Sequence, residues 1–378
     1  MPVHQLHYFN MRDLLNLPSI TARHFISLVL LLIGASGCDG GGGTSAPLFN
    51  VPPVASNSCN AIMDPDPSIV VPLSANDSNG NATIASYTID TLPTNGSLSG
   101  CVSVPCLQSC ATIAQCASFT YTPNASATGL RGMDKFNFHV TDAGGLSSSM
   151  ATAWILNNGK VRIMPLGDSI TEGTGDPNGV GYRRRLFQQL EALVGTGRVD
   201  FVGSLASGNP PDFDLNHEGH GGWCDDSPCS GGFGNIKDSV QGFLSGNPTD
   251  IVLLHIGTND FNVSSAGVDG ILTNISTWAQ SNFPVTVFVA RIIPAVDGTK
   301  TVNTFNDNVA AIATDRPAVK VYNVNQQDVL QLQGQLDKAD PTLMGDNLHP
   351  NQTGYNMMAD KWKLDMQGAT VPVLPTCQ

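Results

Sequence analysis

A serine and a histidine in two separate segments have the surroundings expected of a nucleophile and its general base. Ser169 follows an apolar run over 161–166 and the pair Gly167-Asp168, which predicts a strand-to-helix turn that exposes its hydroxyl. Asp346 lies three residues before His349, a spacing that lets the carboxylate accept the Nδ1 proton of the imidazole. Nε2 could then remove the serine proton. The sequence therefore predicts nucleophilic catalysis by Ser169, His349 and Asp346.

Two further segments offer donors for the negative charge of a tetrahedral intermediate. The segment 217–223 is rich in glycine, so the N–H of Gly222 can approach a ligand without an intervening side chain. Asn259 follows a second apolar run, and its side-chain amide can donate. With the N–H of Ser169, these groups predict an oxyanion hole. His255, inside the apolar run, is expected to be a packed and hydrogen-bonded core residue.

The residue spacings in these segments do not match known metal-binding or nucleotide-binding motifs. The run 217–220 reads His-Glu-Gly-His, which is not the zinc motif His-Glu-x-x-His, and no two cysteines have the Cys-x-x-Cys spacing of structural zinc sites. The glycines at 173, 175 and 179 do not have the spacing of a dinucleotide fingerprint. We therefore expect catalysis without a metal or a cofactor.

The four segments together, in this order over about 180 residues, resemble the SGNH (GDSL) hydrolases, whose name lists Ser, Gly, Asn and His. Ser169, Gly222, Asn259 and His349 match those four positions. Longer stretches look like carbohydrate esterase family 3, which includes acetylxylan esterases; they are Ile163 to Gly173, Asp200 to Ser204, His217 to His220, Leu253 to Asp260 and Leu348 to Asn351. The segment Cys224 to Cys229 departs from that pattern beside the presumed oxyanion glycine. The resemblance implies a deacetylase with a three-layer, flavodoxin-like fold.

From Lys160 onward, short apolar runs alternate with helical stretches, which predicts an α/β domain with a parallel sheet covered on both faces. The predicted strands are 161–166, 199–202, 251–256, 285–293 and 319–324, and helices are expected over 182–194 and 238–244. The functional loops of such sheets lie at the carboxyl ends of the strands. The arginine run 183–185 is interpreted as the solvated face and C-terminal-side packing of a helix, with an arginine that lines a sugar cleft as the alternative.

The segment from about Val51 to Ile155 has short β-rich runs separated by turn clusters, which predicts a small all-β sandwich. The stretches 119–124 and 134–145 resemble the cadherin-like or immunoglobulin-like modules of bacterial surface proteins. Such a module is expected to be a spacer, with carbohydrate or protein binding as the alternative. Asp77, Asn79 and Asn81 are interpreted as a turn rather than as a calcium site.

The leader indicates export. The apolar run 25–37 is too short to span a bilayer and resembles the core of a signal peptide. It ends in Ala-Ser-Gly before Cys38, which resembles the lipobox of bacterial lipoproteins, so Cys38 is the predicted lipidation site. Ordinary secretion is the alternative. Export permits disulfides, and Cys224 is expected to pair with Cys229. The pairing of the N-terminal cysteines stays open, with Cys377 as one candidate partner.

Size and charge limit the other classes of function. A chain of 378 residues is too long to fold around a single hydrophobic core, so more than one domain is expected. The predicted parts are a signal peptide (1–37), a flexible tether (38–50), a β-sandwich (51–157), a hydrolase domain (158–368) and a C-terminal tail (369–378). The net charge of −13 disfavours nucleic acid binding. We expect a monomer held to a membrane through its lipid anchor.

The predicted function is that of an exported serine esterase that removes acetyl groups from plant polysaccharide, with acetylated xylan as the first candidate. Other acyl esters, such as pectic acetyl esters, lysophospholipids or thioesters, are the alternative substrates. A carbohydrate-binding surface lipoprotein without activity is the alternative from another class. The complete set of Ser169, Asp346 and His349 favours the enzyme.

Overall fold

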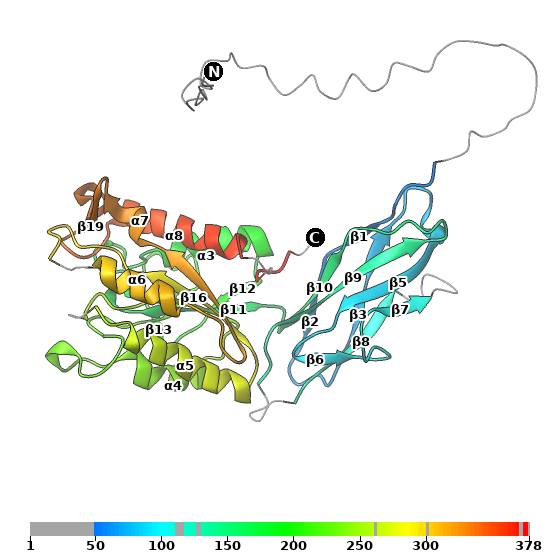
Figure 1. Cartoon of the computed structure of the whole chain (residues 1–378), viewed down its shortest axis with the longest axis horizontal. Helices are drawn as coiled ribbons and strands as arrows, with labels where there is room; N and C mark the ends of the chain where they lie inside the picture. The colour runs from blue at the N-terminus through cyan, green and yellow to red at the C-terminus, as the bar shows by residue number, and fades with distance from the viewer. Residues whose placement is uncertain are drawn as a thin grey trace, which may run out of the picture. The chain divides into compact units, whose positions relative to one another are not determined.

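The apolar runs of the carboxyl-terminal half form one mixed, mostly parallel sheet in the computed structural model (Figure 1). Its strands are β11 Val161–Gly167, β12 Val199–Phe201, β13 Leu205–Ala206, β14 Asn216–Gly219, β15 Ile251–His255, β16 Val285–Arg291 and β17 Val319–Asn325. They follow the order β13-β14-β11-β15-β16-β17, and β12 pairs with β11. The expected parallel sheet gains one antiparallel edge strand, β13, because a strand joined to its neighbour by a short loop needs no crossover helix.

The structure describes residues 49–109, 117–125, 130–260, 263–299, 302–369 and 373–376. The predicted signal peptide, Cys38 and most of the tether lie outside these ranges, as do Cys110, Cys116 and Cys377. Residues 50–378 form one compact unit. Among the helices in the described ranges, none combines the length and the apolar character that a membrane span requires.

Helices cover both faces of this sheet, as Figure 1 shows for α3 and α8 on one face and α4 and α5 on the other. Ile163 and Met164 are neighbours on β11 but lie in two different cores, since successive strand residues point to opposite faces. The first core contains Leu186 of α3 and Trp362 of α8, and the second contains Ile271 of α5. The three-layer arrangement predicted from the alternating pattern is therefore confirmed.

The remaining elements of this half are short or peripheral to the sheet. The helices are α2 Ser169–Glu172, α3 Arg183–Val194, α4 Ile236–Gly246, α5 Ala266–Ser281, α6 Val302–Ile312, α7 Gln327–Leu330 and α8 Gln352–Gln367, with 3-10 turns η2 Ser230–Gly232 and η3 Pro341–Leu343. A small hairpin joins β18 Gln331–Leu332 to β19 Gln335–Ala339. The predicted helices over 182–194 and 238–244 correspond to α3 and α4.

The amino-terminal module is a β-sandwich, as predicted. Its strands are β1 Val54–Ser56, β2 Ser58–Ile62, β3 Ile69–Pro72, β4 Ser74–Asn76, β5 Ile84–Thr91, β6 Gly96–Leu98, β7 Cys106–Ser109, β8 Ser118–Pro123, β9 Asp134–Asp142 and β10 Ala151–Asn157, with the 3-10 turn η1 Asn81–Thr83. The sheets β2-β10-β9-β5-β7 and β3-β8-β6 share one core. Phe138 from the first sheet and Tyr121 from the second both lie in that core. The burial of alternate residues along β9 explains the period-2 pattern of the sequence.

The polar cluster at residues 77–81 of this module has the geometry of a turn. The Asp77 carboxylate accepts the N–H of Asn79 at 2.8 Å, and the Asn81 side chain accepts the N–H of Asp77 at 2.8 Å. Thr83 donates its hydroxyl to the second oxygen of the same carboxylate at 2.5 Å. These local hydrogen bonds use the carboxylate oxygens that a calcium ion would need, which favours the turn interpretation.

Disulfides join Cys101 to Cys106 in the sandwich and Cys224 to Cys229 in the carboxyl-terminal half. The second bond closes the loop that departs from the family pattern. The suggested recruitment of Cys377 concerns a residue outside the described ranges.

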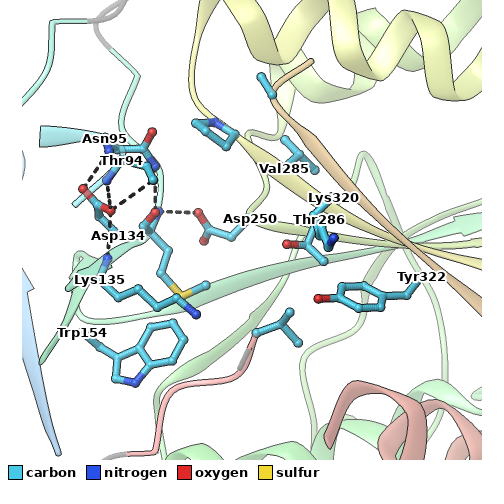
Figure 2. Close-up of a pocket in the computed structure, with 14 residues that line it drawn as sticks. Thr94, Asn95, Asp134, Lys135, Trp154, Asp250, Val285, Thr286, Lys320 and Tyr322 are labelled. Atoms are coloured by element: carbon cyan, nitrogen blue, oxygen red, sulfur yellow. Dashed lines mark hydrogen bonds between the residues drawn. The ribbon is translucent and has the colours of Figure 1, made fainter. Parts of the chain in front are cut away.

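A cavity of about 280 Å³ lies at the amino-terminal ends of β15, β16 and β17 (Figure 2). Its lining includes Trp154, Tyr322 and Asp250, and Asp250 accepts the N–H of Met133 at 2.7 Å. The catalytic candidates follow the carboxyl ends of the parallel strands, which is the opposite edge of the sheet. This cavity is therefore separate from the candidate active site.

Candidate active site

Ser169 stands at the point where β11 passes into α2. Asp168 is the N-cap of this one-turn helix, and its Oδ1 accepts the N–H of Ile170 at 3.0 Å. Asp168 and Ile170 are fully buried, whereas Ser169 keeps 7% of its surface exposed. The serine is thus the residue through which this turn meets solvent, and its N–H belongs to the first helical turn, where backbone donors have no partner within the helix.

His349 and Asp346 complete a hydrogen-bonded chain with the serine. Ser169 Oγ lies 2.9 Å from His349 Nε2, and His349 Nδ1 lies 2.8 Å from Asp346 Oδ2. The Asp346 carboxylate also accepts the N–H groups of Leu348 and His349, both at 2.7 Å. Partial burial alone would raise the pKa of Asp346, but these donors and the imidazole outweigh it and lower that pKa. The carboxylate is therefore ionised at neutral pH and can hold the Nδ1 proton.

The strand register brings the two other predicted segments to the same edge. Gly167 pairs with Gly219 of β14 on one side and with His255 of β15 on the other. The loops that follow these strands therefore emerge beside Ser169. Asn259 Nδ2 donates to the carbonyl of Trp223 at 2.8 Å. Because a primary amide carries two hydrogens, this bond fixes the amide and leaves a second donor for an oxyanion.

Gly222 has a backbone conformation that favours glycine. Its φ is +79°, and a Cβ there would lie 3.1 Å from the ring of Phe233. Phe233 belongs to the loop that follows Cys229, and 55% of its surface is exposed. The structure thus places Gly222 on the loop beside Asn259, under an aromatic ring that also faces solvent.

The titratable side chains of the run 217–220 all form hydrogen bonds with other groups of the protein. His217 accepts the Gly219 N–H at Nδ1 (2.9 Å), and its Nε2 lies 2.8 Å from Ser207 Oγ. Burial lowers the pKa of His217 to about 3, so this ring is neutral. Glu218 accepts from Ser204 and lies 2.9 Å from His220 Nε2. Over the described ranges, the side chains that could hold a metal form no group of three or more.

His255 is buried, as predicted, but the expected hydrogen bonds are absent. Both of its ring nitrogens lack a partner among the residues that the structure describes. Burial lowers the pKa of His255 to about 4. A neutral imidazole loses less than a charged one when its hydrogen bonds are missing, which explains why an apolar strand can hold it.

The interpretation of the arginine run as a solvated face is wrong for its first member. Arg183 is fully buried at the start of α3. Its guanidinium donates to backbone carbonyls of helix α2 (Thr171 and Glu172), of the loop that follows it (Gly179) and of the loop between β13 and β14 (Ser207 and Leu215). Arg184 and Arg185 do lie at the surface, where they pair with Asp212 and Asp360. No periodicity of the sequence distinguishes the buried arginine from its neighbours.

Gly175 is a second residue whose importance the sequence did not reveal. Its φ is +90°, and a Cβ there would lie 2.6 Å from the Cβ of His349 and 2.8 Å from the carbonyl of Pro350. The glycine therefore lets the loop after α2 pack directly on the loop that carries the histidine. A Cβ on Gly173 would likewise lie 2.7 Å from the N of Gly181, so the glycines at 173 and 175 have a local packing role, whereas a Cβ on Gly179 would meet nothing within 4 Å.

Gly175→Ala is expected to lower kcat about tenfold to a hundredfold, because the new methyl group must displace His349 from the serine hydroxyl. Steady-state hydrolysis of nitrophenyl acetate measures the effect. Gly179→Ala is the matched control: Gly179 also has a positive φ of +62°, but a Cβ there would meet nothing within 4 Å. Equal losses in both variants would show that backbone strain, not contact with His349, is responsible.

The arrangement can carry out acyl transfer from an ester to water. His349 is placed to take the Ser169 proton, and Asp346 is placed to stabilise the imidazolium that forms. The loops that carry Gly222 and Asn259 emerge beside Ser169 at the same edge of the sheet.

Comparisons with known proteins identify families and relatives that this chain resembles. Residues 50–155 match the bacterial Ig domain family. A multidomain esterase of Ruminococcus flavefaciens is 29% identical over 234 residues, which cover 56% of this chain and 29% of that protein. The chain therefore spans less than a third of that relative.

Two solved structures are also similar to part of this chain. A family 3 carbohydrate esterase of Clostridium thermocellum is 28% identical, with a TM-score of 0.45, and the match covers 55% of this chain and 95% of that one. A carbohydrate esterase family 3 protein from Talaromyces cellulolyticus is 27% identical, with a TM-score of 0.43 and coverage of 54% and 96%. Residues 166–357, about half of the 378, match the GDSL-like Lipase/Acylhydrolase family. This segment contains Ser169, Gly222, Asn259, Asp346 and His349, and the chain therefore belongs to that family of carboxylic ester hydrolases.

Proposed function

We propose that this protein is an exported serine esterase that removes acetyl groups from polysaccharide, with acetylated xylan as its substrate. The observation that carries the proposal is the hydrogen-bonded chain from Ser169 Oγ to His349 Nε2 (2.9 Å) and from His349 Nδ1 to Asp346 (2.8 Å). This chain supplies an activated nucleophile without requiring a metal ion.

The proposed reaction proceeds in two halves through an acetyl-serine. His349 takes the Ser169 proton as Oγ attacks the acetyl carbonyl carbon, and the carbonyl oxygen becomes an oxyanion held by backbone N–H groups and the Asn259 amide. Collapse of this intermediate breaks the ester bond, and His349 gives its proton to the departing sugar oxygen. In the second half, His349 takes a proton from water, the hydroxide attacks the acetyl-serine, and acetate leaves as Ser169 regains its proton.

Support for a carbohydrate substrate comes from the sequence. The stretches around Ser169, His217, Asn259 and His349 resemble carbohydrate esterase family 3, and the similar Ruminococcus flavefaciens protein is a multidomain esterase. The exposed ring of Phe233 over Gly222 offers an apolar surface beside the site. Pockets for small molecules are commonly lined by such aromatic side chains.

Export and anchoring belong to the same proposal. The disulfides Cys101–Cys106 and Cys224–Cys229 suit an oxidising compartment, and the match of residues 50–155 to a bacterial Ig domain suits an extracellular enzyme. The leader and Cys38 lead us to propose a monomeric lipoprotein with the immunoglobulin-like module as a spacer. Radiolabelled palmitate incorporation that disappears in Cys38→Ser would support the anchor, and incorporation unchanged by that substitution would exclude it.

The substrate is tested by acetate release from acetylated xylan, with the soluble form that lacks residues 1–45, since residues 50–378 form one compact unit. We expect release from xylan and rapid hydrolysis of nitrophenyl acetate, with much slower hydrolysis of octanoyl and longer esters. Hydrolysis of nitrophenyl acetate without release from xylan would retain the esterase and exclude xylan. A preference for long acyl chains would favour the lipid esters instead.

A further inference from the structure

Two acidic residues close in sequence to the proposed oxyanion-hole donors Gly222 and Asn259 contact each other. Asp225 follows Trp223 and Cys224 on the loop that carries Gly222, and Asp260 follows Asn259. The Asp225 N–H donates to Asp260 Oδ2 at 3.1 Å, and the two carboxyl groups are within hydrogen-bonding contact of each other. Since an ionised carboxylate only accepts, such a contact between two carboxyl groups requires that one of them carries a proton.

The surroundings of Asp225 make it the member that keeps the proton. Asp225 is 3% exposed, and its carboxyl group lies against the first turn of α5, where a Cβ on Gly267 would be 2.3 Å from its Cγ. Burial and, after it, contact with Asp260 raise the pKa of Asp225 well above the ordinary carboxyl range.

The other charges near Asp225 do not replace that proton. Asp226 is negative and raises the pKa of Asp225 further. Lys237 of α4 pairs with Asp226 at 2.7 Å. The residue of α5 that contacts the Asp225 carboxyl group is Gly267, which carries no charge. The carboxylate of Asp269, in the first turn of α5, pairs with Arg316.

The carboxyl pair is one of three links between the same two loops. The second is the bond from the Asp225 N–H to Asp260, and the third is the bond from the Asn259 amide to the Trp223 carbonyl (2.8 Å). Gly222 and Asn259, the two donors that the mechanism draws from separate loops, are thus held by one small network. Loss of the shared proton would leave two negative charges in contact at its centre, which is strongly unfavourable when one of them is buried.

We propose that Asp225 is a positioning residue, which shares one proton with Asp260 and thereby holds the Gly222 loop in register with Asn259. The inference rests on the proposed esterase function, since it concerns the donors of that oxyanion hole. It predicts that the wild type loses activity as the pH rises and Asp225 gives up its proton.

The test compares Asp225→Asn with Asp225→Ala across the pH range, in kcat and in kcat/KM for nitrophenyl acetate. Asparagine can still donate a hydrogen bond to Asp260 but cannot ionise, so Asp225→Asn should keep activity to higher pH than the wild type. Alanine cannot donate, so Asp225→Ala should lower kcat about tenfold to a hundredfold at pH values where the wild type keeps the Asp225 proton, with little change in KM. Asp226→Asn removes a neighbouring negative charge that raises the pKa of Asp225, so the alkaline loss of activity should move to lower pH in this variant.

An alkaline limb that is identical in Asp225→Asn and the wild type would overturn the proposal, as would full activity in Asp225→Ala. Urea unfolding gives a readout that does not depend on catalysis. A raised native pKa means that the proton is retained in the folded protein at a pH where the unfolded chain has lost it, so stability falls as the pH rises through this window. Wild type should lose more stability than Asp225→Asn over that range. If the wild type loses more stability than Asp225→Asn but no variant and no wild-type protein hydrolyses esters, the shared proton is supported and the proposed esterase function is wrong.

Discussion

Ser169→Ala is expected to lower kcat for nitrophenyl acetate about a million-fold, because serine hydrolases that lose their nucleophile keep only the contribution of binding and the oxyanion hole. Ser169 Oγ is the oxygen that lies 2.9 Å from the proposed base, His349 Nε2. The loss should appear in kcat, with a modest change in KM. Pre-steady-state and steady-state kinetics of the purified variant measure it, and the unfolding midpoint should stay near that of the wild type.

The matched control for this prediction is His349→Ala, alone and combined with Ser169→Ala. Residues that act as one unit are not additive, so the double variant should be about as slow as each single variant. A loss of less than about a hundredfold in Ser169→Ala would show that another group attacks the ester. In that case the geometry at Ser169 would be structural, and the proposed mechanism would be wrong.

Arg183→Ala is expected to destabilise the fold by at least about 3 kcal/mol, because several buried carbonyls lose their donor and each unsatisfied group costs roughly 1–3 kcal/mol. Those carbonyls include Thr171 in the serine helix α2, and Ser207 and Leu215 in the loop between β13 and β14. Burial lowers the pKa of Arg183 to about 10, which leaves the guanidinium charged at neutral pH. Urea unfolding at neutral pH measures the effect.

Arg184→Ala is the control for that measurement. Arg184 is adjacent in sequence but pairs with Asp212 at the surface, and exposed ion pairs contribute about 0–1 kcal/mol. We expect a change of less than about 1 kcal/mol in this variant. If the two substitutions cost the same, the buried hydrogen bonds of Arg183 do not hold the loops together, and another group must supply that stability.

Much of the site could be predicted because its residues follow strand ends. Ser169 comes directly after β11, and Asn259 follows β15 by a few residues, so the alternating apolar pattern was enough to place both at one edge. Asp346 and His349 are three residues apart, and a contact within so short a loop is nearly local. The prediction was weaker where a residue's environment depends on distant segments, as the buried Arg183 and the unpaired ring of His255 show.

The sequence by itself determined the alternation of strands and helices, the two-part organisation and the choice of the proposed nucleophile and base, since these depend on periodicity and on short spacings. Only the tertiary structure decided that Gly175 must lack a side chain beside His349, that Arg183 is enclosed while Arg184 is not, and that Asp225 meets Asp260. The physical reason is that burial and charge contact depend on segments far apart in the chain, and a solvated and an enclosed arginine have the same letter in the sequence.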